Sequence, residues 1–474
     1  MKFQFFDMFD FLKKKIVYNI VFFLIVLFYV FTRVLMYIKY GQIAFGYDTG
    51  IYRHYIIGYF ERFGDKTLVP FGFSYFSNLF RSLGFSVHFI MYDLYILISV
   101  GILLSFFFVV KLFTNNKYTA LVAMFLYSIS IVQFEFYWWY YYRNFLALFL
   151  IFISFILLKY KSYWVSLSLV VIGTIHPISY FFVVLCGLFY SFFDKEKRRF
   201  IWISGVLSLF LVLLINFREW QLYLVTAFGE NGFTFKSSGT MNEFSGQFIS
   251  NDFFWRQVIF YLPLSIWGFC KFWKKQILFT VFTIVSLALL ILQVLFYKRV
   301  FVFVDVAIIF FASLGLTEVS QFFLDKKKVW KFVWFVFLII YTVLLSFLLF
   351  GYVSNKQTLI SENDFSALDF IDYDITPGSY LLTVSSNYGP WLYGFTNARV
   401  IAPGLFENDK WSIGDWNIFW YSNSQEKIKD LLRVYNTKTI YVYVGEKFNY
   451  FSNILKENDM CQHLDIFLWQ CNLE

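Results

Sequence analysis

The sequence predicts a polytopic, all-helical membrane bundle of about eleven transmembrane helices, followed by a small extracytoplasmic α/β domain. Of the 474 residues, 59% are hydrophobic and only 15% are charged, whereas soluble domains contain about 25% charged residues. Most of the apolar residues lie in long runs, and the composition becomes that of a soluble domain from Ser361 onward. This composition excludes a soluble globular enzyme, a disordered chain and a nucleic-acid-binding protein, despite a formal net charge of +9.

Apolar runs mark the predicted spans. A helix that crosses a bilayer needs about 20 apolar residues, because lipid offers the backbone no hydrogen-bond partner. The clearest runs are Ile16–Ile38, Phe89–Leu112, Tyr118–Phe136, Phe200–Phe217, Ile277–Phe296, Val300–Leu316 and Val333–Val353. Weaker or shorter runs, which could be tilted, broken or re-entrant, are Phe145–Leu158, Tyr163–Ile175, Ile178–Phe193 and Gln257–Phe272. The first run follows Lys13–Lys15 and lacks a small-residue cleavage site, so we expect a retained signal anchor.

Basic residues predict the orientation in the cell membrane. Short connections containing Lys13–Lys15, Lys197–Arg199 and Lys326–Lys328 all fall on one side of the predicted spans. An excess of Lys and Arg is typical of cytoplasmic loops, so the amino terminus is predicted to be cytoplasmic. An odd number of spans then places the carboxyl-terminal domain outside. The long loops 39–88 and 218–255 lie on that outer face, where we expect the function.

The chain is thus predicted to divide into a transmembrane domain, residues 1–353, and an extracytoplasmic domain, residues 354–474. In the latter, alternating patterns predict helices at Asn363–Tyr373 and Gln425–Val434 and strands at Tyr380–Val384 and Thr439–Val444, as in a small α/β domain. Cys461 and Cys471 flank a short apolar run. In an oxidising compartment they could pair across a terminal hairpin, or remain as free buried cysteines.

Polar residues near the membrane are functional candidates, because polar groups are costly there. Asp48 follows the first predicted span, with Arg53 and His54 shortly after it. Partial desolvation can raise the pKa of a carboxyl group and suit it to general-base catalysis. Alternatively, Asp48 caps a helix that begins at Thr49 or Gly50.

A second candidate segment contains Glu135 and Arg143. Glu135 could bind a cation or orient an acceptor, and Arg143 could bind phosphate. The aromatic residues between them are typical of an interfacial Trp/Tyr belt. Glu135 and Arg143 could also simply neutralise each other.

Further candidates occur at a helix break and in a late connection. Proline at His176-Pro177 is expected to break a helix, and His176 could donate to a phosphate or a sugar hydroxyl. It could equally be a buried histidine satisfied by a carbonyl group. Lys298 and Arg299, followed by Asp305, form a cationic pair suited to a lipid phosphate, or alternatively reach for lipid headgroups.

The predicted topology places these carboxylates and cations on the same face. A carboxylate opposite a group of cations is what transfer from a phosphate leaving group requires.

Several of these features together resemble a known superfamily. They are Asp48 soon after the first span, Arg143-Asn144 opening a span, the His176-Pro177 break, Arg299 followed by Asp305, and, in the tail, Thr376-Pro377-Gly378 and Tyr388-Gly389-Pro390-Trp391. In this combination the chain resembles the GT-C superfamily of polytopic glycosyltransferases. These include oligosaccharyltransferase catalytic subunits, protein O-mannosyltransferases and aminoarabinose transferases.

The chain departs from some of these families. It has one acid, Asp48, where several subfamilies have an adjacent pair, and it lacks an Asp-x-Asp motif in the second outer loop. The Trp-Trp-Asp signature of oligosaccharyltransferases is absent from the tail. These departures weaken a metal-dependent interpretation, although Mg or Mn remains possible, and they argue against N-linked protein glycosylation.

The resemblance implies an inverting transfer of a sugar from a polyprenyl-phosphate-linked donor to an acceptor hydroxyl outside the membrane. Asp48 would be the general base, and Arg143, His176, Lys298 and Arg299 would bind the donor phosphate. Residues implied for the acceptor or a cation are Glu135, Arg53, His54, Asp305 and Trp391. Loop 218–255 could close over the donor as a lid. The expected partners are the donor, membrane lipids and a glycan, lipid or protein acceptor, without nucleic acid.

Two other functions remain open at this point. A flippase or transporter of lipid-linked saccharides would bind near the bilayer midplane and often contains repeated halves, which this sequence lacks. A non-catalytic envelope scaffold would use the tail to bind partners.

Overall fold

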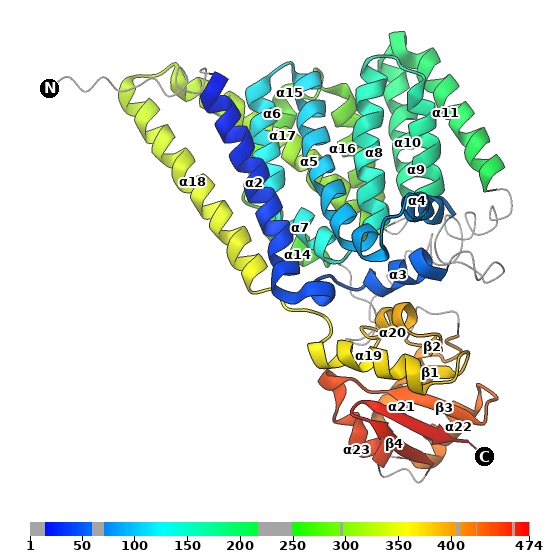
Figure 1. The fold of residues 1–474 in the computed structure, drawn as a ribbon. Helices are drawn as coiled ribbons and strands as arrows, with labels where there is room; N and C mark the ends of the chain where they lie inside the picture. Colours follow the sequence, from blue (N-terminus) through cyan, green and yellow to red (C-terminus); the bar gives the residue numbers. More distant parts are fainter. Residues whose placement is uncertain are drawn as a thin grey trace.

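A bundle of apolar helices forms one part of the molecule and a small sheet domain forms the other (Figure 1). The computed structural model describes residues 15–58, 71–216, 249–293, 297–403, 408–422, 424–456 and 460–473. The amino-terminal ends of α2 (Lys15–Tyr40) and α18 (Lys328–Ser354) lie at the end of the bundle opposite to the sheet domain (Figure 1). The last helix of the bundle therefore leads the chain directly into that domain.

Most helices of the bundle follow the predicted apolar runs. Besides α2 and α18, its helical elements are η1 (Gly41–Ala44), α3 (Thr49–Gly58), α4 (Phe71–Ser82), η2 (Phe89–Asp93), α5 (Leu94–Thr114), α6 (Lys117–Ser128), α7 (Ile131–Trp138), α8 (Tyr142–Lys159), α9 (Trp164–Ile175), α10 (Pro177–Phe193), α11 (Lys195–Ile215), α14 (Asn251–Val258), α15 (Leu262–Phe272), α16 (Ile277–Leu292), η3 (Tyr297–Val300) and α17 (Phe301–Leu324). Of these, η1, α3 and α4 lie in the predicted loop 39–88.

The length of these helices limits the number of spans. Among the described residues, six helices are long and apolar enough to cross a membrane, or up to seven if the bent pair α6 and α7 counts as one span. Helices α9, α10 and α16 are apolar but shorter. The chain is a multi-pass membrane protein, and the count of eleven spans stays a prediction.

One of the clearest predicted spans is wrong in its continuity, and one of the weaker runs, for which a break was left open, is broken. The run Tyr118–Phe136 bends by 52° between α6 and α7, because Ser130 caps α7 by accepting a hydrogen bond from the Gln133 amide. The run Gln257–Phe272 is interrupted between α14 and α15, where Pro263 lies in the first turn of α15 and cannot continue a preceding helix. The predicted break at His176-Pro177 is confirmed, since Pro177 opens α10.

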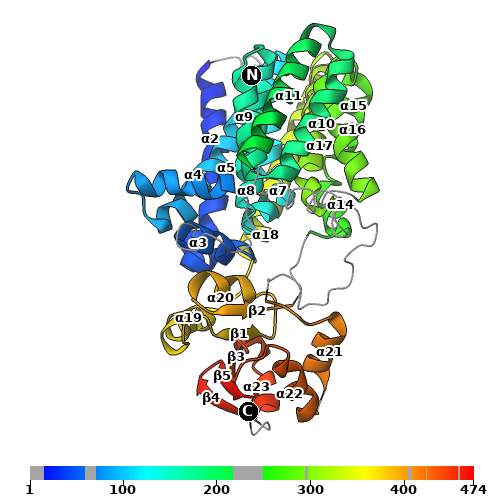
Figure 2. The same cartoon turned by 90° about the vertical axis from the view of Figure 1, so that its right-hand side faces the viewer.

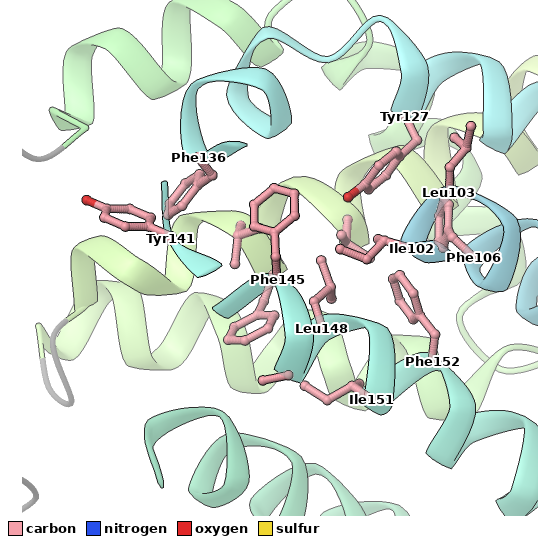
Figure 3. Close-up of a cluster of buried hydrophobic side chains, with 14 of the residues drawn as sticks. Ile102, Leu103, Phe106, Tyr127, Phe136, Tyr141, Phe145, Leu148, Ile151 and Phe152 are labelled. Carbon is pink, nitrogen blue, oxygen red and sulfur yellow. The ribbon is translucent and has the colours of Figure 1, made fainter. Parts of the chain in front are cut away.

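Aromatic side chains fill the centre of the bundle (Figure 3). Phe106 of α5 packs against Tyr127 of α6 and Phe152 of α8, with ring centroids 5.5 Å and 5.2 Å away. At one end of the cluster Tyr141 lies against Phe136, with centroids 5.2 Å apart, and its hydroxyl points out of the cluster (Figure 3). The aromatic core therefore reaches the segment that carries the candidate site residues.

The tail forms a five-stranded mixed sheet with a hydrophobic core of its own. Its elements are α19 (Glu362–Asp374), β1 (Tyr380–Thr383), α20 (Gly389–Phe395), β2 (Arg399–Ile401), α21 (Ile413–Tyr421), α22 (Gln425–Arg433), β3 (Thr439–Tyr443), η4 (Glu446–Phe448), α23 (Phe451–Lys456), β4 (Cys461–Asp465) and β5 (Leu468–Asn472). The strand order is β2-β1-β3-β5-β4, with β1 parallel to β2 and β3 and the other pairs antiparallel. The four elements predicted for the tail are confirmed within one residue at each end.

A disulfide closes the terminal hairpin. Cys461 and Cys471 face each other in the antiparallel pair β4–β5 and are bonded. Of the two alternatives, the structure contains the paired one.

The tail docks on the bundle through α20, which lies directly against α3 (Figures 1 and 2). Gly50 and Gly394 face each other at this crossing. A Cβ atom on Gly50 would overlap the carbonyl group of Pro390, and one on Gly394 would lie 2.6 Å from the Cα of Gly50. Only glycine permits backbones to approach this closely. The contact places the tail next to the loop that carries Asp48.

Candidate active site

Asp48 lies in a short loop between η1 and α3 that is held against the segment after α7. The Gly46 amide donates to the Trp138 carbonyl at 2.7 Å, and the Asp48 amide to the Trp139 carbonyl at 3.4 Å. The side chain of Asp48 is only 11% exposed. Its carboxylate caps no helix among the described residues. Instead, its Oδ2 lies 3.9 Å from Nη2 of Arg299.

Two arginines face this carboxylate, and each is held by a polar neighbour. Nη1 of Arg299 donates to the Asn144 Oδ1 at 3.4 Å, and Nε of Arg143 donates to the Tyr52 hydroxyl at 3.2 Å. Burial raises the pKa of Asp48 above its ordinary value, while the positive charges of Arg299 and Arg143 oppose this shift. Asp48 is therefore a carboxyl group that holds its proton to a higher pH than an exposed aspartate.

His176 completes this group from a third helix start. It caps α10, with its Nδ1 accepting from the Ser179 amide at 3.2 Å and lying 2.7 Å from the Ser179 hydroxyl. Its Nε2 is buried and has no hydrogen-bond partner among the described residues. Burial, and then the positive charges of Arg143 and Arg299, lower the pKa of His176, so the imidazole is neutral. The imidazole thus keeps one nitrogen available for a ligand that binds between the arginines.

The starts of four helices converge here, because α3, α8, α10 and α17 begin at or next to these residues. The unpaired amides and positive dipole end of a helix start favour an anion. Lys298 is half-buried beside Arg299 on η3. The structure therefore brings together Asp48, Arg143, His176 and Arg299, and the surroundings of Asp48 suit a phosphate.

Asp305 is placed inside the bundle rather than in this group. It is fully buried, and its carboxylate accepts hydrogen bonds from the Ser130 hydroxyl at 2.7 Å, the Gln133 side chain at 2.9 Å and the Tyr261 hydroxyl. These contacts join α17 to α7 and to the segment between α14 and α15.

Glu135 also faces away from the arginines. Its carboxylate accepts from Lys356 Nζ at 2.7 and 2.8 Å and from the Tyr352 hydroxyl at 2.5 Å. The ammonium group of Lys356 lies 3.8 Å from the centre of the Trp138 ring. The alternative in which Glu135 neutralises Arg143 is therefore wrong. The sequence did not indicate a role for Lys356, because a lysine just after the last apolar run is expected simply where the tail begins.

Arg53 and His54 connect the bundle to the tail. Arg53 donates to the Gly394 carbonyl, and its guanidinium lies 3.9 Å from the centre of the Phe395 ring. The Nδ1 of His54 is 3.0 Å from the carbonyl oxygen of Tyr393, and the two rings stack with centroids 3.9 Å apart. Both residues hold α3 against α20, next to the candidate site.

Buried polar atoms of the tail lie next to the loop that carries Asp48. The Tyr47 hydroxyl lies beside Ser386 in the loop between β1 and α20. Among the described residues, the Asn387 Oδ1 and the Trp391 Nε1 are buried without a hydrogen-bond partner. Buried polar groups normally have partners, so these atoms are suited to a polar ligand. Ser386 and Asn387 were missed because a Ser-Asn segment predicts only a turn.

The described acids of this region, Asp48 and Glu135, do not form a site for a resident divalent cation. In the part of the chain that the structure describes, no three His, Cys, Asp or Glu side chains lie close enough together to hold a metal ion. Asp48 faces arginine and Glu135 binds lysine.

The fold is similar to that of two solved membrane proteins. One is the Archaeoglobus fulgidus oligosaccharyltransferase, crystallised with Zn and sulfate, with 11% identity, a TM-score of 0.58, and coverage of 89% of this chain and 68% of that one. The other is ArnT from Cupriavidus metallidurans bound to undecaprenyl phosphate, with 11% identity, a TM-score of 0.51, and coverage of 95% and 98%.

The predicted resemblance to the GT-C superfamily, to which both proteins belong, is thus confirmed for the fold. No protein-family model matches the sequence, and no curated protein is significantly similar to it.

Proposed function

We propose that this protein is a membrane glycosyltransferase that moves a sugar from a polyprenyl-phosphate-linked donor to an acceptor hydroxyl on the extracytoplasmic face. The fold supports the general class, since its structural neighbours are an oligosaccharyltransferase and ArnT, the latter bound to undecaprenyl phosphate. The observation that carries the proposal is the buried Asp48 carboxylate 3.9 Å from Arg299, with Arg143 and His176 around it.

In the proposed reaction the acceptor hydroxyl attacks the anomeric carbon of the donor sugar and gives its proton to Asp48. The bond between the anomeric carbon and the phosphate oxygen breaks, and the oxygen leaves with the electron pair. Attack from the face opposite to the phosphate inverts the configuration. The raised pKa of Asp48 suits it to accept this proton, because a general base works best with a pKa near the working pH.

The cations stabilise the leaving group. Arg143 and Arg299 lie where the phosphate gains negative charge, and the Nε2 of His176 can donate to one of its oxygens, because Nδ1 accepts from the Ser179 amide and leaves the ring proton on Nε2. Preorganised donors at such a position contribute about 10²–10³-fold each to the rate. Because the donors are placed by helix starts, little reorganisation is needed during the reaction.

The acceptor is proposed to approach from the tail. The buried polar atoms of Tyr47, Ser386 and Asn387 lie at or next to the Asp48 loop, and the Asn387 Oδ1 has no partner among the described residues, so hydroxyl groups of an acceptor could bind there. The predicted lid, loop 218–255, lies largely outside the described residues, which resume at Ile249 and form α14 from Asn251.

Transfer of radiolabelled sugar from a polyprenyl-phosphate donor by the purified protein in detergent tests the proposal. Product formation supports an enzyme, because a flippase cannot register transport without a sealed compartment. The proposal would be contradicted if a folded protein that binds the donor transferred sugar to none of the glycan, lipid and peptide acceptors tested.

A further inference from the structure

Arg33 is a buried cation in α2, one of the helices long and apolar enough to cross a membrane. The residue is 0% exposed, so its guanidinium group does not reach water or lipid headgroups. Among the described residues it forms no ion pair with an acid, and its Nε and Nη2 have no hydrogen-bond partner. A charge at membrane depth is costly, so a residue that keeps one there is a candidate for function.

Aromatic rings surround this charge in place of an acid. The central carbon of the guanidinium group lies 4.3 Å from the ring centroid of Tyr29, 5.1 Å from that of Phe134 and 5.4 Å from that of Tyr137. The faces of aromatic rings attract cations, most strongly where water is excluded. Phe134 and Tyr137 both belong to α7, so the charge of Arg33 holds this short helix against α2.

Tyr137 is held from two sides. Its hydroxyl donates to the Arg33 carbonyl at 3.2 Å, and its own carbonyl accepts from the Tyr95 hydroxyl at 2.9 Å. The rings of Tyr95 and Tyr137 are parallel, with centroids 5.0 Å apart. Tyr95 belongs to α5, so the end of α7 is fixed between α2 and α5.

The end of α7 supports the loop that carries Asp48. The carbonyl groups of the two residues that follow Tyr137 accept hydrogen bonds from the Gly46 and Asp48 amides. A displacement of this helix end would therefore move the Asp48 carboxylate relative to the arginines that face it. An error of about 1 Å in the position of a reacting group can lower a rate about 10²-fold.

We infer that Arg33 is a positioning residue for Asp48. Its charge holds the end of α7 through the aromatic faces, and the backbone of that end holds the loop. The inference rests on the proposed function only for the reaction that Asp48 serves. A neutral side chain of similar length would keep the packing of α2 and lose the attraction to Phe134 and Tyr137.

Arg33→Met makes this change. Methionine is long, flexible and apolar, so it fills most of the space and leaves no buried charge, and we expect the variant to fold and insert. Hydrogen exchange at the Gly46 and Asp48 amides should become ~10-fold faster, as expected when a desolvated cation–π contact is lost. The kcat for sugar transfer should fall at least ~10-fold, with little change in KM for the donor. Arg33→Lys keeps a cation and should recover most of both losses.

Ile25→Ala is the matched control. Ile25 is a buried residue of the same helix, about two turns before Arg33. The substitution should lower the melting temperature by opening a cavity. It should leave kcat and the exchange at Gly46 and Asp48 unchanged, because Ile25 has no contact with α7 in this chain of support.

Unchanged exchange and kcat in the Arg33→Met variant would overturn the inference and leave the proposed function standing. Exchange that accelerates equally throughout the bundle would also overturn it, because the loop would then not be the part that Arg33 holds. A lack of recovery in Arg33→Lys would refute the role of the charge. If the unchanged protein transfers no sugar, the proposed function fails, and the exchange rates at Gly46 and Asp48 alone decide whether Arg33 positions the loop.

Discussion

Replacing Asp48 by Asn removes the proposed base while preserving the shape of the side chain. The backbone hydrogen bonds of the loop do not involve the carboxylate, and the side chain caps no described helix, so we expect the variant to fold and insert. The asparagine side chain cannot take the proton from the hydroxyl group of the sugar acceptor. A positioned general base contributes about 10²–10⁴-fold to a rate, which is about 3–5 kcal/mol of activation free energy.

The structure predicts that this loss appears in kcat and not in KM for the donor. At 3.9 Å the attraction between Asp48 and Arg299 is about 4 kcal/mol if the effective dielectric constant is near 20. In the Asn variant the charge of Asp48 is gone, so it no longer competes with the donor phosphate for Arg299. Donor KM should therefore stay unchanged or fall while kcat falls by two to four orders of magnitude.

The pH dependence provides a second measurement. Burial raises the pKa of Asp48, so the carboxyl group keeps its proton to a higher pH than an exposed aspartate, near 3.9. The carboxylate form, which is the base, is gained as the pH rises through the raised pKa of Asp48. As the pH is lowered, kcat/KM should therefore begin to fall at a pH above the ordinary pKa range of aspartate. Asp48→Asn should abolish this acid limb.

Sugar transfer by purified variants, measured from pH 4 to 9, checks both expectations. Asp93→Asn is a suitable control, because Asp93 is a half-exposed acid whose carboxylate lies 3.9 Å from His88. A correctly inserted Asp48→Asn variant with undiminished kcat and an unchanged acid limb would refute the assignment of Asp48 as the base.

Three further changes test the supports of the site. Gly50→Ala should loosen the tail by about 1–3 kcal/mol, because the new Cβ would overlap the backbone of α20, and faster proteolytic release of the tail would measure this. Glu135→Gln should lower thermal stability by about 3–5 kcal/mol, because Lys356 would then be a buried cation without its anion. Reducing the Cys461–Cys471 disulfide, which joins residues ten apart, should destabilise the tail towards denaturant by about 3 kcal/mol.

Each of these expectations has a control. Gly205→Ala adds a methyl group to a helical position with open space around it and should leave proteolysis unchanged; equal release from both glycine variants would contradict the clash. Adding Lys356→Met to Glu135→Gln should recover stability, and a simple sum of the two single effects would show that the pair is not coupled. The reductant should not affect the bundle, because Cys186 and Cys270 are free.

Local sequence patterns predicted the regular elements well. The predicted strand Thr439–Val444 and helix Gln425–Val434 each differ from the structure by one residue, since alternating and helical periodicities depend on neighbours along the chain. The same patterns were wrong where a polar contact interrupts an apolar run. Ser130 begins a new helix inside the run Tyr118–Phe136 because it binds both the Gln133 amide and Asp305, and the latter lies 175 residues away.

The candidate site was predictable in part. Charge and topology arguments placed Asp48, Arg143, His176 and Arg299 on one face, and the structure groups them. The same arguments could not assign Glu135, because its partner Lys356 is 221 residues away. They could not find Ser386 either, because only the docking of the tail brings it beside Tyr47.

The sequence by itself determined that this protein is a multi-pass membrane protein with a polar tail, because the cost of exposing backbone to lipid acts on every residue of a run and needs no partner. It also determined which residue types are available for chemistry near the membrane surface. Only the tertiary structure decided which carboxylate faces arginine and which one faces lysine. Side-chain pairing depends on how helices distant in the chain pack together, and a difference of a few ångströms changes the partner of a buried charge.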